Sequence, residues 1–152
     1  MILEAHGIRI ELPPGWSGRV FSRSPHTATL HAGNFQLPLD DGEFGDRTTS
    51  EMPDVATFLA LTEYRPGSGL KPGVGLFAPD RIRLPLDPSR FGANRLQHPH
   101  PGQVGAQQFF TQAGRPFCLY TVLAGPRTVR RRQLLGADHV LRTLRISPGA
   151  GA

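Results

Sequence analysis

VGAQQFFTQAGRPFCLYTVLAG, residues 104–125, carries the strongest local signal of secondary structure in this sequence. Apolar residues run through both of its halves, and the halves meet at Ala113-Gly114. A short pair of turn-forming residues between two apolar runs is typical of a β-hairpin. We therefore predict two buried antiparallel strands here, and we place this hairpin at the centre of a sheet.

The residues after the hairpin have the pattern of a helix. Pro126 suits the first position of a helix, and apolar residues then recur at intervals of three and four through residues 127–144. The pattern predicts one amphipathic helix that packs on the sheet and closes a single domain of residues 1–146. The last residues, 147–152, are SPGAGA, and we expect a flexible tail there.

The N-terminal part predicts further strands. Residues 6–12, HGIRIEL, alternate apolar and polar side chains, as a half-buried strand does. The turn PPGWSG follows, and we expect its Trp16 to plug one end of the core. Two more strands are predicted in residues 18–24 and 27–37, with a hairpin loop between them.

The middle of the chain is harder to assign. Residues 38–56 read as a loop with one turn of helix. The short apolar run at 57–64, TFLALTEY, suits a helix or a strand, and its Thr, Phe and Tyr content favours a strand. Seven prolines exclude any long helix or central strand from residues 65–103, where only 76–86 is expected to pair with a sheet. The predicted class is α+β: an antiparallel sheet against a C-terminal helix, with a long Pro/Gly-rich meander.

Composition limits the cellular compartment in which the protein is expected. Cys118 is the only cysteine, which excludes an intramolecular disulfide and a multi-cysteine zinc site. The first ten residues carry Glu4, His6 and Arg9, unlike a signal peptide, and no stretch approaches the ~20 apolar residues of a membrane span. We therefore expect a cytoplasmic protein with no membrane association and no cofactor.

The order of the predicted elements resembles a known superfamily. LPPGW after the first strand, antiparallel strands, a late buried hairpin and a helix ending in VLRTLRI are similar to the PsbP/Mog1-like superfamily of small α+β proteins. The chain also resembles uncharacterised single-domain actinobacterial proteins of about this length. The superfamily includes photosystem extrinsic subunits, a small-GTPase release factor and lipoproteins. The resemblance implies an accessory or binding role and supplies no shared catalytic residue; without a lipidation cysteine, an envelope role is not expected.

Three further motifs contain residues that could carry chemistry, and each favours an ordinary structural role. Cys118 lies between apolar neighbours, where a thiol is buried and inert. The glycine-rich loop 67–75 lacks the Gly-Lys-Ser/Thr ending of a phosphate-binding loop. The acidic residues of LDDGEFGD, residues 39–46, do not have calcium-loop spacing and indicate a solvated loop that could also dock a basic partner.

Two histidines lie between prolines in RLQHPHPG, residues 95–102. In an extended segment His98 and His100 point to the same side, so both could face one metal ion, and His31 would be a third ligand. Two ligands are too few for zinc, and nothing in the sequence brings His31 near. A stiff surface loop is the favoured interpretation. The alternative is a small enzyme or metal-dependent protein with its site at these three histidines.

The net charge is +5, and the positive charge is nearly all arginine. Only RTVRRR, residues 127–132, concentrates it, and no aromatic residues are interleaved for base stacking. Arg127, Arg130 and Arg131 form a candidate anion site, and nucleic-acid binding is expected to be weak. The favoured function is a non-enzymatic binding or accessory domain with a protein partner, with self-association as a further mode; an anion or nucleic-acid binder is the second alternative.

Overall fold

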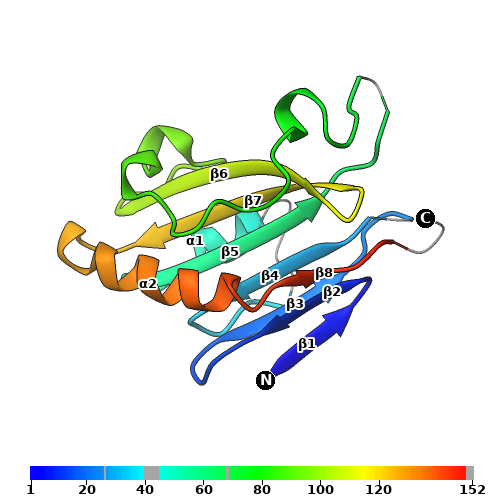
Figure 1. The fold of residues 1–152 in the computed structure, drawn as a ribbon. Helices are drawn as coiled ribbons and strands as arrows, with labels where there is room; N and C mark the ends of the chain where they lie inside the picture. The colour runs from blue at the N-terminus through cyan, green and yellow to red at the C-terminus, as the bar shows by residue number, and fades with distance from the viewer. Residues whose placement is uncertain (26, 40–44, 68, 150–152) are drawn as a thin grey trace.

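The computed structural model describes residues 1–25, 27–39, 45–67 and 69–149. Its largest element is a five-stranded antiparallel sheet with the strand order β3-β4-β5-β7-β6 (Figure 1). The strands have these bounds: β3 Ser17–Phe21, β4 Thr29–Gly33, β5 Ala56–Glu63, β6 Gln103–Gln112 and β7 Arg115–Ala124. The predicted α+β class is therefore confirmed, as is the choice of a strand at 57–64.

The hairpin predicted at 104–125 forms as β6 and β7. Gln112 pairs with Arg115, and the intervening Ala113 and Gly114 both have positive φ, 55° and 73°. Every residue of β7 is buried, and β7 lies between β5 and β6. The predicted position inside the sheet is thus confirmed for β7 but not for β6, which is an edge strand.

A second, three-stranded sheet holds both ends of the chain. It has the order β1-β2-β8, with β1 Ile2–Ala5, β2 Ile8–Glu11 and β8 Arg145–Ile146. The strand predicted over 6–12 forms as β2 at Ile8–Glu11, whereas β1 was not predicted; His6 and Gly7 adopt positive φ and turn the chain between the two strands. The sequence of the half-exposed β1, ILEA, has no clear alternation of polar and apolar residues. The two-residue β8 is too short to show such a pattern.

The C-terminal helix packs on one face of the five-stranded sheet (Figure 1). A 3₁₀ turn, Arg127–Val129, leads into α2, Arg130–Leu141, which ends three residues earlier than the predicted pattern. Its buried side chains join a core that contains the predicted Phe110 and Leu119, with Trp16 packed against it. No helix among the described residues is long and apolar enough to cross a membrane.

The opposite face of the sheet has a smaller apolar cluster. Phe58 and Tyr120 form its centre, and the short helix α1, Asp46–Ser50, begins beside it where Gly45 lies against the Phe58 ring. One turn of helix in this region was predicted. The Tyr120 hydroxyl accepts a hydrogen bond from the Gln97 amide at 2.7 Å, which holds the histidine-containing loop to the same face.

The meander 65–103 contains three short 3₁₀ turns and covers the outer edge of β6. The strand pairing expected for 76–86 was wrong. The prolines in this segment lack donors, and the Gln108 side chain bonds instead to the backbone of Arg83 at 2.8 and 3.3 Å. Gly92 and Gly105 form an isolated β-bridge between the meander and β6. The meander therefore protects an edge strand without extending the sheet.

Candidate functional site

A groove of about 670 Å³ lies between α2 and the 85–91 segment of the meander. We call it the arginine groove. Its lining combines apolar side chains with three guanidinium groups, one hydroxyl and one carboxylate: Pro85, Leu86, Pro88, Ser89, Phe91, Arg127, Arg130, Arg131, Leu134, Leu135 and Asp138. An apolar cleft with a few placed polar groups is the usual form of a ligand site.

The helical repeat explains why α2 presents these residues together. Arg131, Leu134, Leu135 and Asp138 are separated by three, four and seven positions, which places them on one face of a helix. Along the helix axis the arginine comes first, the two leucines follow, and the aspartate is last. Leu135 is 60 % exposed on this face, although it is a large apolar side chain at the centre of the helix.

The structure brings the three arginines of the predicted anion site to one end of the arginine groove. Arg127, Arg130 and Arg131 have no ion-pair or hydrogen-bond partner for their side chains among the described residues. The first turn of α2 has no acidic residue and no side-chain cap, so the positive end of the helix dipole adds to the same field. This end of the groove is therefore strongly anion-attracting.

Asp138 holds the two walls of the arginine groove together. Its side chain extends from α2, and its Oδ1 accepts a hydrogen bond from the Leu86 amide at 2.8 Å. The residue is 6 % exposed. Sequence reasoning did not single out Asp138; the only signal was an acidic residue within the apolar stripe of the helix. The facing wall, residues 85–91, was not predicted either, because sequence does not show where a meander docks.

The structure does not assemble the three histidines of the predicted alternative site. His31 is 1 % exposed in β4, and its ring lies edge-on to Phe21 and Phe58 at 5.2 and 5.3 Å. His98 and His100 are both half-buried, and Nδ1 of His98 lies 4.0 Å from Oδ1 of Asp46. Within the ranges that the structure describes, no three His, Cys, Asp or Glu side chains are grouped to hold a metal ion.

The acidic stretch 39–46 and the glycine-rich loop 67–75 are described by the structure to different extents. Asp40, Asp41 and Glu43 of the acidic stretch lie outside the described residues. In the glycine-rich loop, the Gly73 amide donates to the Thr111 hydroxyl at 2.8 Å, and a bridge joins Gly67 to Leu70. The loop is thus held by contacts with itself and with β6.

Cys118 lies in β7 and is 3 % exposed, as predicted. Burial raises the pKa of its thiol to about 12, and burial also raises the pKa of the neighbouring Tyr64 hydroxyl to about 12. A thiolate is the reactive form, so the folded protein holds this sulfur in its inert state.

The expected result is slow modification of Cys118 by a disulfide reagent at pH 8. In denaturant the thiol has an ordinary pKa near 8.5 and is about one-quarter ionised at that pH. In the native protein a pKa of about 12 leaves only about one thiol in 10,000 ionised. The native protein should therefore react roughly 1000-fold more slowly than the protein in denaturant. Absorbance of the released thiolate follows both rates. Comparable rates in the two states would show that the strand opens readily.

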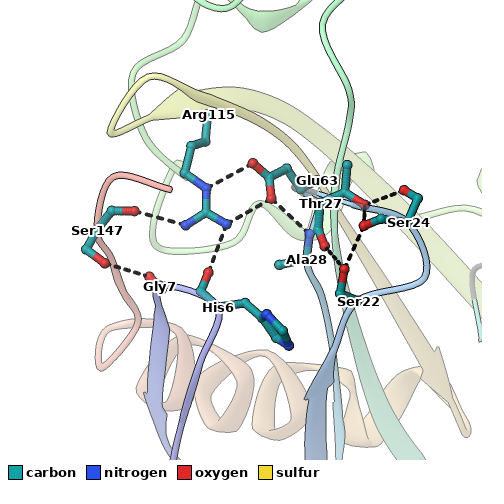
Figure 2. A network of polar contacts seen from close by, with 9 residues as sticks. All are labelled: His6, Gly7, Ser22, Ser24, Thr27, Ala28, Glu63, Arg115 and Ser147. Atoms are coloured by element: carbon teal, nitrogen blue, oxygen red, sulfur yellow. Dashed lines mark hydrogen bonds and ion pairs between the residues drawn. The ribbon is translucent and has the colours of Figure 1, made fainter. Parts of the chain in front are cut away.

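A separate polar cluster joins the two sheets (Figure 2). Arg115 and Glu63 form a buried ion pair at 2.8 Å, with side chains 8 % and 7 % exposed. The guanidinium also donates to the carbonyls of His6 and Ser147, and the carboxylate accepts from the Ala28 amide at 2.9 Å. We call this group the Arg115 clamp. Its hydrogen bonds are made within the chain, which is typical of a structural role.

Ser147, the first residue of the predicted flexible tail, makes three hydrogen bonds to the rest of the chain. Its hydroxyl donates to the Gly7 carbonyl at 3.3 Å, and its carbonyl accepts from Arg115 (Figure 2). Its amide also donates to the Gly7 carbonyl, at 2.9 Å. Residues 150–152 lie outside the described residues.

Comparisons of this chain with models of protein families, with curated proteins and with solved structures give no match.

Proposed function

We propose that this protein is a non-enzymatic binding or accessory domain that acts in the cytoplasm and docks an acidic, apolar segment of a partner protein in the arginine groove. The observation that carries the proposal is three arginines without partners among the described residues at one end of a groove with an apolar floor. A single buried cysteine suits a reducing compartment. The element order that resembles the PsbP/Mog1-like superfamily, whose members include accessory proteins, agrees with this role.

Charge and shape favour an acidic peptide as the occupant. Arginine and aromatic side chains are enriched at the centres of protein interfaces, and the groove offers three arginines beside Phe91. Carboxylates can pair with guanidinium groups in a bidentate manner, which selects acidic side chains over neutral ones. The exposed Leu135 gives an apolar contact that a hydrophilic anion would leave unused. A volume of about 670 Å³ suits a few side chains of a short segment.

Reversing the charge of the groove should remove binding. The triple variant Arg127→Glu, Arg130→Glu, Arg131→Glu should bind the acetylated and amidated probe peptide Glu-Glu-Leu-Phe-Leu roughly 10- to 100-fold more weakly than the wild type in calorimetric titration. The fold should persist, because acidic residues near a helix N-terminus are favourable. Binding by the wild type should also weaken with added salt.

The matched control changes the net charge equally at exposed arginines that do not line the groove. Arg83→Glu, Arg95→Glu, Arg142→Glu should retain affinity within about twofold to threefold, since only long-range electrostatics change. Equal losses in both triple variants would contradict a localised site. Failure of the wild type to prefer the acidic probe over Gln-Gln-Leu-Phe-Leu would overturn the proposal. Sedimentation that shows wild-type dimers, lost only in the groove variant, would assign the groove to a second copy of the chain instead.

A further inference from the structure

A second pocket, of about 170 Å³, lies on the opposite flank of α2 from the arginine groove. We call it the Trp16 pocket. Its helical residues are spaced by three, four and seven positions, and the turn before β3, the end of β4 and the start of β5 supply the rest: Trp16, Asn34, Val55, Thr57, Val129, Arg132, Gln133 and Gly136. No residue lines both this pocket and the arginine groove.

The Trp16 pocket contains a hydroxyl group without a hydrogen-bond partner. Thr57 in β5 is 1 % exposed, and its Oγ1 is enclosed and makes no hydrogen bond among the described residues. A buried polar group without a partner destabilises a protein, and a valine of the same shape would avoid that cost. A ligand that accepts a hydrogen bond would explain why a threonine stands here.

The helical wall of the pocket contains a glycine that the fold does not require. Gly136 lies inside α2, where glycine is among the least favourable residues. Its φ is not in the left-handed region, and a methyl group at this position would meet no atom within 4 Å. Neither backbone geometry nor close packing therefore explains this glycine. Its missing side chain leaves space in the Trp16 pocket.

The polar side chains of the pocket are mostly hydrogen-bond donors. The exposed Arg132 guanidinium has no partner among the residues that the structure describes. Asn34 Oδ1 accepts from the Thr57 amide at 2.8 Å, which leaves its Nδ2 group to donate. The half-buried Trp16 indole adds a flat apolar wall. These groups match a ligand that has a negative charge, accepts hydrogen bonds and presents a flat apolar face.

We propose that the Trp16 pocket binds a small aromatic carboxylate, whose ring lies against the Trp16 indole and whose carboxylate takes Thr57 and Arg132 as donors. The long side chain of Arg132 has no other partner among the described residues and can turn toward the carboxylate. A volume of about 170 Å³ limits the ligand to a single ring with a short acidic group. This inference is independent of the proposed function, because the two sites share no lining residue.

Trp16 is the only tryptophan of the chain, so its fluorescence reports directly on the pocket. Benzoate titrated into the full chain should change this emission with a Kd of roughly 0.1–1 mM. Benzamide, the neutral analogue, should bind at least about fivefold more weakly. Cyclohexanecarboxylate, which has the charge without the flat ring, should bind roughly threefold more weakly.

Two variants should gain stability while they lose affinity. Thr57→Val keeps the shape of the side chain and removes the hydroxyl, so its melting temperature should be about 2–4 °C higher and its affinity for benzoate roughly 3- to 10-fold lower. Gly136→Ala should change both quantities in the same directions, because alanine favours the helix and its methyl group narrows the pocket. A purely structural role would change the melting temperature alone.

A third variant tests the charge. Arg132→Gln should bind benzoate and benzamide equally, whereas the control Arg142→Gln, an exposed arginine outside the pocket, should keep the preference for benzoate. Absence of benzoate binding by the wild type below about 10 mM, equal binding of benzamide, or unchanged affinity in Thr57→Val overturns the inference. Binding that is lost in the arginine-groove triple variant but kept in Arg132→Gln also overturns it, because benzoate would then occupy the arginine groove.

Discussion

Replacing Arg115 by leucine should lower the free energy of unfolding by about 3–5 kcal/mol in urea denaturation. The substitution leaves the Glu63 carboxylate buried at 7 % exposure without its cation. It also removes the donors to the carbonyls of His6 and Ser147, which tie the turn of the small sheet and the end of β8 to the large sheet. A buried charge that loses its partner costs far more than the pair itself contributes.

Two further variants show whether the effect comes from the orphaned charge. Glu63→Leu combined with Arg115→Leu should recover part of the loss, because no buried charge remains. Arg9→Ala, which removes the exposed pair with Glu11, should change stability by less than about 1 kcal/mol. If Arg115→Leu proves as mild as Arg9→Ala, the clamp has no role in joining the sheets.

Phe110→Ala should cost about 3–5 kcal/mol of stability, since the truncation creates a cavity in the main core. Phe110 is fully buried in β6 and stacks on Phe117, with ring centroids 5.6 Å apart and an angle of 21°. Chemical denaturation measures the loss, and the dependence of the unfolding free energy on denaturant concentration should not change. The control, Leu76→Ala, truncates a side chain that is 59 % exposed and should shift stability by less than about 1 kcal/mol. Equal effects would place Phe110 outside the core.

The elements predicted from sequence were those with long apolar patterns or clear turn chemistry. The hairpin of β6 and β7 follows from two apolar runs around Ala113-Gly114, and α2 follows from its helical repeat. β1 pairs with the adjacent β2 through a two-residue turn and was missed because its sequence, ILEA, has no polar–apolar alternation. β8 was missed because it has two residues and its partner β2 is remote in the sequence. Such pairings depend on tertiary contacts and leave little local signal.

The candidate site likewise contains residues that could be identified from the sequence and residues that could not. Arg127, Arg130 and Arg131 were identified because a charge cluster on a predicted helix is a local feature. The apolar wall from Pro85 to Phe91 was not, since its position depends on the bond between Asp138 and Leu86, 52 residues apart. The predicted grouping of His31 with His98 and His100 had no local basis, and the structure uses His31 as a core side chain between two aromatic rings.

The pairing of Ile8 with Ile146 has a consequence for synthesis of the chain. β2 is synthesised well before β8, so the small sheet is not complete, and the Ser147 bond of the clamp cannot form, until residues 145–147 have been made. Ile8 and Ile10, which are fully buried in the folded protein, lie in a strand that contacts α2 and β8, and both of these elements are made later. Loop closure over such a separation is slow. Nascent chains should therefore be substrates for holding chaperones until the C-terminal segment emerges.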